Sequence, residues 1–363
     1  MNYEFRRKKI IKKLKRKGID SFLTREQVNV HYLCPSFKGE SVILVTKDIT
    51  FLLVDSRYTQ QAKFEIADEK GIELVEMRKP FLKSLLKLFA KTGVKNTAFE
   101  VEHTTYDFFE TLKKNCRGIK LEPTKGWVEN LRIIKDDEEV KNIRRACNII
   151  DRAMTTLIKN IKWGKMSELD LANELEYGLK KEGSEQLPFY PIIASGSRTS
   201  FPHAHSTNEL LREGELVIID CGASCQGYGS DLTRTIGKNI MDAKKKETYN
   251  LVLKVQETAI KNVKPGVKTS DLCKLVREMF WEKDVAQFFI HGLGHGVGLN
   301  IHEAPSLSSH GSVNLKEGMV ITIEPGIYIP NKYGVRIEDT VLVTSKGYEV
   351  LTGLYKNCWQ ASS

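Results

Sequence analysis

Four apolar segments in the second half of the chain each carry an acidic residue. ELVIID ends in Asp220, DLTRTIG begins with Asp231, MVITIE ends in Glu324, and GVRIEDT contains Glu338. Their branched and aliphatic residues are typical of buried strands. A carboxylate in such surroundings is unfavourable unless it is paired or bound to a metal ion. We therefore expect the fold to bring these strands together around a shared positive charge.

The segment between the first two acids predicts a hairpin. CGASCQGYGS contains Gly222, Gly227 and Gly229, which favour turns, so that Asp220 and Asp231 would face each other. Two carboxylates that close repel each other, and a cation between them resolves the repulsion. Two divalent ions would balance all four carboxylates and can hold a shared hydroxide at neutral pH. Oxygen ligands together with an imidazole suit Mn, Fe, Co or Zn.

The stretch HGLGHGVGLNIHEAP supplies three candidate imidazoles, His291, His295 and His302. The spacing of the first two would suit one face of a helix. However, every second residue from 292 to 298 is glycine, and each glycine costs about 1 kcal/mol in a helix interior. The stretch is therefore not expected to be helical, and its glycines are expected to let the backbone pass close to a substrate.

Two other functions for this stretch are disfavoured. A dinucleotide-binding loop needs a βαβ unit followed by an acid about twenty residues on, and neither surrounds these glycines. IHEAP also lacks the second histidine of a helical zinc-protease motif. A single acid at the end of a strand is usually a turn residue. A single histidine is usually a hydrogen-bonded residue of the core. The combination of Asp, Asp, His, Glu and Glu in this order is more specific than its parts.

The order of expected elements predicts two domains. Residues 1–127 alternate strand-like and helical segments, which indicates an α/β domain with a mixed or mostly parallel sheet. Residues 128–363 indicate an α+β domain, with helices packed on a curved, mostly antiparallel sheet. Capping boxes mark two helix starts in this second domain, Asp136 with Glu139 and Ser167 with Asp170.

The net charge of +10 and the nine Lys or Arg among the first seventeen residues raise the alternative of nucleic-acid or membrane-surface binding. Ile10, Ile11, Leu14 and Ile19 form a partial apolar stripe in the same segment. We therefore expect a helix with one solvated face, and neither nucleic acid nor membrane as a partner. No apolar run is long enough to span a membrane, and the N-terminus has no secretory signal.

The seven cysteines are odd in number and scattered, which is typical of reduced thiols in a cytoplasmic protein. Cys221 and Cys225 lie close together, but no second pair completes a zinc ribbon. We expect both to be ordinary buried residues.

At this point the chain resembles the pita-bread metallopeptidases, in particular their Xaa-Pro aminopeptidase and prolidase branch. The matching stretches follow the family's order: FPHAHS, VIIDCGA, SDLTRT, HGLGHGVGLNIHE, ITIEPGIY and GVRIEDT. The first domain resembles the creatinase-like N-terminal domain through VNVHYLCPSFKGESVILVT and LLVDSRYTQQA. The resemblance therefore spans nearly the whole chain.

The resemblance implies a centre with two divalent metal ions, Mn first and Co, Zn or Fe as alternatives. Asp231 and Glu338 would bridge the ions, Asp220 would complete one of them, and His295 and Glu324 the other. Glu324 would also be the general base. The implied catalytic residues around the ions are His203, His302, His291 and Arg336. His203 and His302 would stabilise the intermediate and relay protons, with His302 as the donor to the proline nitrogen. His291 would lie near the substrate, and Arg336 at its far end or beside the ligands.

The predicted function is that of an Xaa-Pro aminopeptidase, which releases the first residue from peptides with proline in second position. The first alternative is an Xaa-Pro dipeptidase, which accepts only dipeptides. A methionine aminopeptidase is disfavoured because it does not need the first domain. A creatinase-like hydrolase and a non-catalytic binding protein are disfavoured because all five metal ligands are present. The resemblance also implies a homodimer.

Overall fold

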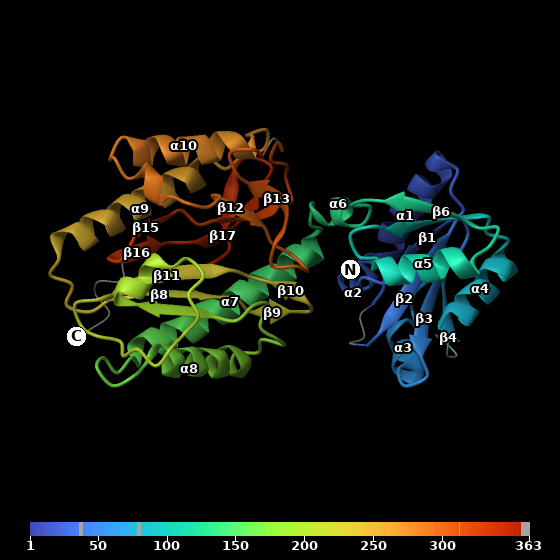
Figure 1. The fold of residues 1–363 in the computed structure, drawn as a ribbon, viewed down its shortest axis with the longest axis horizontal. Helices are drawn as coiled ribbons and strands as arrows, with labels where there is room; N and C mark the ends of the chain where they lie inside the picture. Colours follow the sequence, from blue (N-terminus) through green and yellow to red (C-terminus); the bar gives the residue numbers. More distant parts are fainter. Residues whose placement is uncertain (36–38, 78–80, 312, 357–363) are drawn as a thin grey trace. The chain divides into compact units, whose positions relative to one another are not determined.

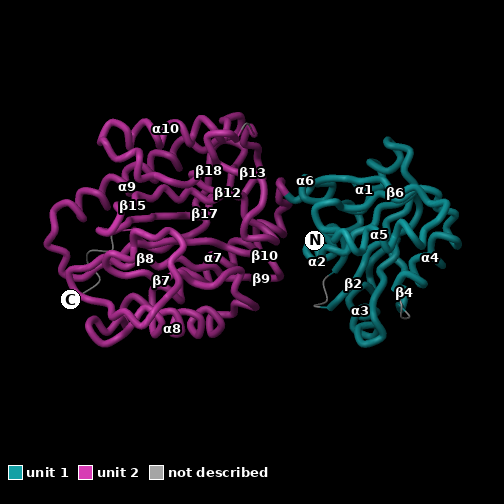
Figure 2. The backbone as a smooth tube through the Cα atoms, viewed as in Figure 1, with its two compact units in different colours: residues 1–132 teal, residues 133–363 magenta. Residues whose placement is uncertain are grey.

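The computed structural model describes residues 1–35, 39–77, 81–311 and 313–356. The chain divides into two compact units, Met1–Arg132 and Ile133–Ser363, which are coloured separately in Figure 2. Cys358 lies outside the described residues, as does the SFK part of the first-domain motif. Each unit has its own sheet and helices, and they are described separately.

Unit 1 is an α/β domain built on a six-stranded sheet with the order β4-β3-β2-β1-β5-β6. The pairs β1–β5, β3–β4 and β5–β6 are parallel, and the pairs β1–β2 and β2–β3 are antiparallel. The mixed sheet expected from the sequence is therefore confirmed. Its elements are α1 (Tyr3–Lys17), β1 (Ser21–Thr24), α2 (Gln27–Leu33), β2 (Ser41–Thr46), β3 (Thr50–Asp55), α3 (Thr59–Glu65), β4 (Ile72–Met77), α4 (Phe81–Thr92), β5 (Asn96–Glu100), α5 (Tyr106–Asn115), β6 (Lys120–Thr124) and α6 (Glu129–Arg132).

The basic first helix, α1, is only partly a solvated face. Ile10 and Leu14 are fully buried, as the apolar stripe predicts, but Arg6 and Arg7 are buried as well. Arg7 donates to the carbonyl oxygen of Leu33 at 2.9 Å and pairs with Glu69 at 2.9 Å. Two of the nine basic residues therefore hold unit 1 together, because a buried guanidinium must satisfy its donors internally.

Unit 2 is the α+β domain that the sequence predicts. Every strand pair among its described residues is antiparallel. Both capping boxes are present, at the starts of α7 and α8. Its elements are α7 (Asp137–Lys159), α8 (Glu168–Lys181), β7 (Ile192–Ser195), η1 (Gly196–Ser200), β8 (Leu216–Cys221), β9 (Ser224–Cys225), β10 (Tyr228–Gly229), β11 (Leu232–Gly237), α9 (Ala243–Lys261), α10 (Thr269–Trp281), η2 (Ala286–Phe288), β12 (Gly294–Gly296), β13 (Glu303–Leu307), β14 (Val320–Ile323), β15 (Gly326–Ile329), β16 (Tyr333–Arg336), β17 (Asp339–Val343) and β18 (Tyr348–Val350).

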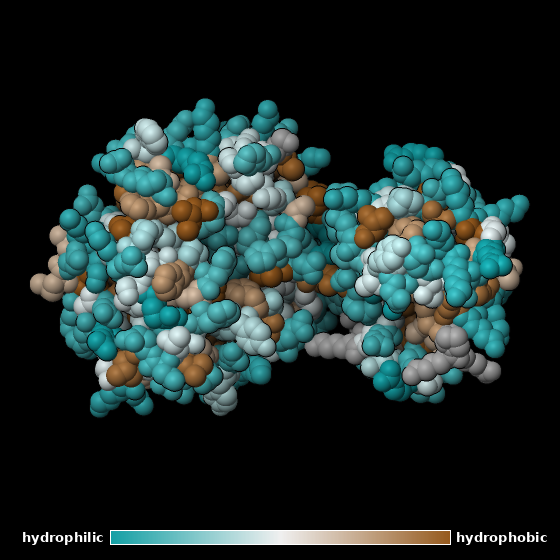
Figure 3. Space-filling model, viewed as in Figure 1, coloured by the Kyte–Doolittle hydropathy of each residue, from teal (hydrophilic) through white to brown (hydrophobic). Residues whose placement is uncertain are grey.

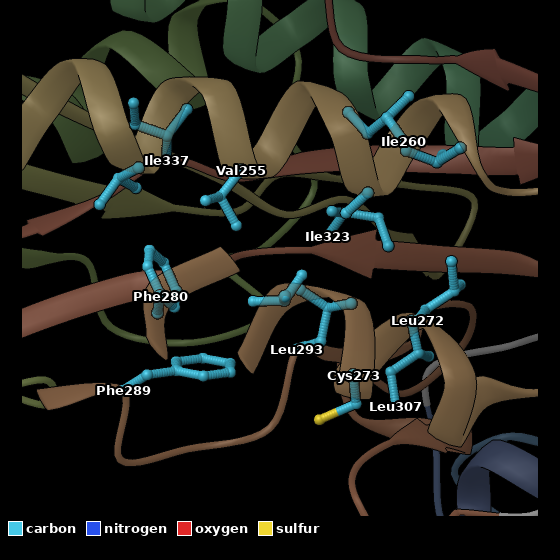
Figure 4. Packing of buried hydrophobic residues seen from close by; sticks show 14 of the residues in the cluster. Val255, Ile260, Leu272, Cys273, Phe280, Phe289, Leu293, Leu307, Ile323 and Ile337 are labelled. Atoms are coloured by element: carbon cyan, nitrogen blue, oxygen red, sulfur yellow. The ribbon is translucent and has the colours of Figure 1, made fainter. Parts of the chain in front are cut away.

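The helices of unit 2 form two layers with the strands between them (Figure 1). One apolar core joins α7 and α8 to the sheet β11-β8-β7. A second core joins α9 and α10 to the sheet β13-β12-β14-β17-β18, with Val255, Leu272, Phe280 and Ile323 at its centre (Figure 4). Helices cover one face of each sheet, so the uncovered faces of the two sheets can pack against each other. The acidic residues lie between these two faces.

Two predicted strands are interrupted at their acidic residues. MVITIEPGIYI divides into β14 and β15 around Glu324 and Pro325, and GVRIEDTVLVT divides into β16 and β17 around Glu338. β14 pairs with β17, and β15 pairs with β16 in a separate ribbon. Pro325 has no N–H to continue a ladder, so the strand breaks there. Glu324 and Glu338 therefore lie where the chain changes sheets.

No helix among the described residues is long and apolar enough to cross a membrane. On the face seen in Figure 3, the hydrophobic side chains form small areas separated by hydrophilic ones. Scattered exposed apolar residues are ordinary at protein surfaces.

Candidate active site

The hairpin predicted between Asp220 and Asp231 is present. β8 pairs with β11 in antiparallel register, with Asp220 opposite Thr233, and the short ribbon of β9 and β10 lies between them in sequence. Both aspartates are buried. The register therefore places their side chains on neighbouring strands, at the end of the hairpin that the sequence predicts.

Glu338 joins this hairpin through hydrogen bonds from both its backbone and its side chain. Its N–H donates to the carbonyl oxygen of Thr233 at 3.1 Å, and its Oε2 accepts from the Thr233 hydroxyl at 2.6 Å. On the same stretch, the Thr340 hydroxyl donates to the carbonyl oxygen of Asp231 at 2.8 Å. The break between β16 and β17 thus directs Glu338 towards the two aspartates.

His295 enters the cluster from β12. Its Nε2 lies 3.4 Å from Glu324 Oε1 and 3.6 Å from Asp231 Oδ2, while its Nδ1 lies 3.1 Å from the carbonyl oxygen of Gly296. Because a carbonyl can only accept, Nδ1 carries the proton and Nε2 presents its lone pair. Burial lowers the pKa of His295 to about 4, so the ring is neutral near pH 7. A lone pair that faces two carboxylates calls for a cation between them.

The buried carboxylates lack partners for several oxygen atoms. Among the described residues, Asp220 Oδ1, Asp231 Oδ1 and Glu338 Oε1 are buried without any hydrogen bond. Burial, together with the neighbouring acids, raises the pKa values of Asp231 and Glu338 and that of Glu324 to about 8. Unpaired oxygens and like charges at close range are unfavourable unless a cation binds them.

The geometry groups some of the predicted ligands more tightly than others. Asp231, His295 and Glu338 each offer a ligand atom within 4.8 Å of the other two. Asp220 instead pairs with Arg336, whose Nη2 lies 2.6 Å from Asp220 Oδ2, while Glu324 adjoins His295. The donor set of carboxylate oxygens and one imidazole fits a hard or borderline divalent cation. All five predicted ligands also line a single cavity of about 680 Å³.

The glycines around His295 have a role in strand packing that the sequence did not predict. A Cβ at Gly294 would lie 2.1 Å from the carbonyl oxygen of Thr322, and one at Gly296 would lie 2.2 Å from that of Ala304. These glycines allow close contact between β12 and its neighbours β13 and β14, while Gly292 and Gly294 also line the cavity. As predicted, the stretch is not helical, and Gly294–Gly296 form the strand β12.

Arg336, Tyr328 and His291 form a directional chain of hydrogen bonds beside the cluster. Arg336 Nη1 donates to the Tyr328 hydroxyl at 2.8 Å, and that hydroxyl lies 3.0 Å from His291 Nε2. His291 Nδ1 lies 2.7 Å from the carbonyl oxygen of Gly292, so Nδ1 is the donor and Nε2 accepts from the tyrosine. Burial lowers the pKa of His291 to about 4 and raises the pKa of Tyr328 to about 12. The chain is therefore neutral except for the guanidinium.

Tyr328 is a site residue that the sequence reasoning missed. It is 3 % exposed and lines the cavity between His291 and Arg336. The available signal was a tyrosine four residues after Glu324 in an otherwise apolar strand. Thr233 and Thr322 were missed as well, although each binds a predicted ligand: Thr233 donates to Glu338, and the Thr322 hydroxyl donates to Glu324 at 3.2 Å.

The two remaining predicted histidines also line the cavity. His302 lies next to His295, with ring centroids 4.3 Å apart in an edge-to-face arrangement, and burial lowers its pKa. His203 lies on an exposed turn after η1, and His205 lines the cavity beside it. The structure therefore brings every predicted site residue to one cavity.

The turn that carries His203 is held by Glu168, at the start of α8. Glu168 accepts from the backbone N–H groups of Ser195 at 2.7 Å and Thr207 at 3.0 Å, and from Arg198 Nε at 3.1 Å. Its side chain has 0 % exposure. One buried carboxylate thus anchors both ends of the segment around His203.

Comparisons with known proteins agree with this geometry. Residues 141–345 match the model of metallopeptidase family M24, and residues 6–134 match the creatinase/prolidase N-terminal domain. The chain is 38% identical to an Xaa-Pro dipeptidase of Pyrococcus horikoshii over 349 residues, covering 95% of this chain and 96% of that protein.

Solved structures give the same picture. An Xaa-Pro dipeptidase from Bacillus anthracis superposes with a TM-score of 0.94 at 34% identity and covers 99% of both chains. An X-Pro aminopeptidase from Thermotoga maritima superposes with a TM-score of 0.89 at 34% identity and covers 96% of this chain and 99% of that one. The match over most of the chain shows that this protein belongs to metallopeptidase family M24.

Proposed function

We propose that this protein is an Xaa-Pro dipeptidase that uses two divalent metal ions. The observation that carries the metal-dependent chemistry is the set of buried carboxylate oxygens without partners facing the cavity. The preference for dipeptides is supported by relatives named Xaa-Pro dipeptidase at 38% identity over nearly the whole chain. The sequence alone favoured an aminopeptidase, and these relatives favour its alternative.

The proposed ligands are Asp220, Asp231, His295, Glu324 and Glu338, with Mn as the first candidate metal. Such ions, when bound, supply a water of lowered pKa and polarise the scissile carbonyl. Glu324 Oε1 lies at the cavity, 3.4 Å from His295 Nε2, and we assign it to accept the proton of the attacking water.

Two histidines around the cavity are assigned to protonation of the leaving group and to stabilisation of the negative charge on the carbonyl oxygen. Cleavage before proline releases a secondary amine, whose nitrogen must gain a proton. His302 lies beside His295 at the cavity surface and relays to that nitrogen the proton that the attacking water gives up. His203 faces the same cavity and stabilises the charge on the carbonyl oxygen. Arg336 orients Asp220 through their 2.6 Å ion pair.

The aminopeptidase remains a second candidate because of one feature of the cavity. A dipeptidase must bind the free carboxylate of its substrate. Arg336 is the only Lys or Arg among the described residues that line the cavity, and it is already bound to Asp220 and Tyr328. A longer peptide needs no such cation, and an X-Pro aminopeptidase is among the structures similar to this chain.

A comparison of two substrates separates these functions. Rates on Ala-Pro and on Ala-Pro-Gly should be measured with the same metal-loaded enzyme. A dipeptidase cleaves Ala-Pro at least about tenfold faster, expressed as kcat/KM. Equal or faster cleavage of the tripeptide identifies the aminopeptidase. If neither peptide is cleaved with Mn, Co or Zn supplied, both proposals fail.

A further inference from the structure

One wall of the cavity is formed by a single face of α8. Leu169, Ala172, Asn173 and Glu176 line the cavity at the spacing i, i+3, i+4 and i+7. This spacing places the four side chains along one stripe of a helix. The neighbouring face of α8, with Leu171, Leu175 and Leu179, is buried against the sheet β11-β8-β7. The wall is therefore part of a rigid element.

Glu176 is the charged residue of this wall. It is half-buried, and it forms no hydrogen bond or ion pair within the part of the chain that the structure describes. Apart from the four carboxylates proposed as metal ligands, it is the only acid among the described residues that line the cavity. Its charge is thus available to a ligand and is not needed by the metal centre.

The wall adjoins Asp220 through the neighbouring strand. β7 pairs with β8, and Ile192 is the direct cross-strand partner of Asp220. Ile192 and Tyr190 line the cavity together with the α8 stripe. We place the free amine of the substrate at the Asp220 side of the centre, where Asp220 Oδ1 is buried without a hydrogen-bond partner among the described residues. The side chain of the first substrate residue then extends along the wall formed by α8 and Tyr190.

We propose that this wall is a subsite for a lysine or arginine as the first residue of the substrate. The aliphatic part of such a side chain packs on Leu169, Ala172 and the exposed ring of Tyr190, and its cation binds Glu176. The wall offers an apolar surface and one carboxylate, which suit the apolar stem and the charged end of such a side chain. This inference rests on the proposed function for its orientation, and goes beyond it in naming the first substrate residue.

The test compares Lys-Pro with norleucine-Pro, which has an unbranched aliphatic side chain without the terminal charge. The measured quantity is the ratio of their kcat/KM values. We expect this ratio to fall by about three- to fivefold in Glu176→Gln, as for a partly exposed ion pair. It should fall further in Glu176→Lys, because like charges repel, while activity on norleucine-Pro is retained in both variants.

Glu174 offers a matched control, because it is exposed on the same helix and does not line the cavity. Glu174→Gln should leave the ratio unchanged. A ratio in Glu176→Gln within twofold of the wild-type value overturns the subsite. If the metal-loaded wild type cleaves no Xaa-Pro dipeptide, the proposed function fails instead. Calorimetric binding of Lys-Pro and norleucine-Pro to the wild type and Glu176→Gln then still decides whether Glu176 recognises the cation.

Discussion

Glu338 and Asp339 are consecutive residues, yet their carboxylates enter two buried clusters of opposite character. Glu338 belongs to what we call the carboxylate cluster, with Asp220, Asp231, Glu324 and His295. Asp339 belongs to what we call the paired cluster, with Arg234, Lys356 and Gln256. Arg234 Nη2 and Lys356 Nζ lie 2.8 Å and 2.7 Å from its two oxygens.

The two clusters differ in how their charge is balanced. Burial alone would raise the pKa of Asp339, but Arg234 and Lys356 outweigh it and lower that pKa. In the carboxylate cluster, burial and repulsion raise the pKa of Glu338, and one of its oxygens has no partner. A buried charge that the chain itself neutralises serves the fold. A buried charge that it leaves unbalanced indicates a ligand.

The largest effect is expected from Glu338→Gln. This change removes one proposed bridging ligand, and kcat/KM on Ala-Pro should fall by at least about four orders of magnitude, or roughly 5 kcal/mol. The metal-free protein should not lose stability, because one of the repelling carboxylates is gone. Steady-state kinetics and thermal unfolding in EDTA measure both results. Substantial activity with metal supplied would show that Glu338 holds no essential ion.

Asp339→Ala should reduce stability, in contrast to Glu338→Gln, which should reduce activity. It leaves Arg234 buried, with 0 % exposure, opposite no carboxylate. Breaking a buried pair in this way costs about 3–5 kcal/mol of stability. Chemical denaturation should show this loss in the presence and absence of metal alike. If Asp339→Ala were as stable as the wild type but inactive, the paired cluster would belong to the active site and not to the fold.

The sequence predicted most of the carboxylate cluster because its residues break a local rule. An acid within an apolar strand is conspicuous, and glycines beside a histidine exclude a helix. The paired cluster was not predicted because its members are far apart in sequence and each looks ordinary alone. Arg234 lies inside DLTRTIG as any strand residue would, and Lys356 follows the last strand. Only tertiary contact reveals that they share Asp339.

The places where the prediction differed from the structure have a similar cause. MVITIEPGIYI reads as one strand, yet it divides because Pro325 cannot continue the ladder and each half finds a different partner. The glycines around His295 were predicted to lie close to a substrate. Two of them line the cavity, but the sequence did not predict that neighbouring strands also approach them. Residues such as Tyr328 are defined by their hydrogen-bond partners, which local sequence does not contain.

The pH dependence of stability should separate the clusters without any mutation. In metal-free protein, the folded-state pKa of Glu324 is raised from 4.5 to about 8. A raised pKa of an acid contributes stability that is complete below about 4.5 and is lost as the pH rises through about 8. The free energy of unfolding in EDTA should therefore fall across this interval, by up to about 1.4 kcal/mol per pH unit. Added divalent metal should abolish the fall, and its persistence would exclude the cluster as the cause.

Glu168→Gln should have the smallest of these effects. It tests whether Glu168, like Asp339, is a buried carboxylate whose charge the chain itself balances. Glu168 receives only donors, so its charge is balanced by hydrogen bonds and by Arg198. The NH2 group of a glutamine would face N–H groups that now donate to Glu168. The turn that carries His203 would then be held less firmly. We expect kcat to fall by about tenfold, roughly 1.4 kcal/mol, while KM and metal affinity change little, because Glu168 contacts none of the proposed ligands.

The control for this variant is Glu174→Gln on the same helix, which should match the wild type in every measurement. Metal affinity is best followed by calorimetry with Mn, because it reports the carboxylate cluster independently of turnover. A parallel loss of metal affinity and kcat in Glu168→Gln would mean that the turn supports the metal centre itself. A loss of stability with unchanged kcat would assign Glu168 to the fold alone, in the same class as Asp339.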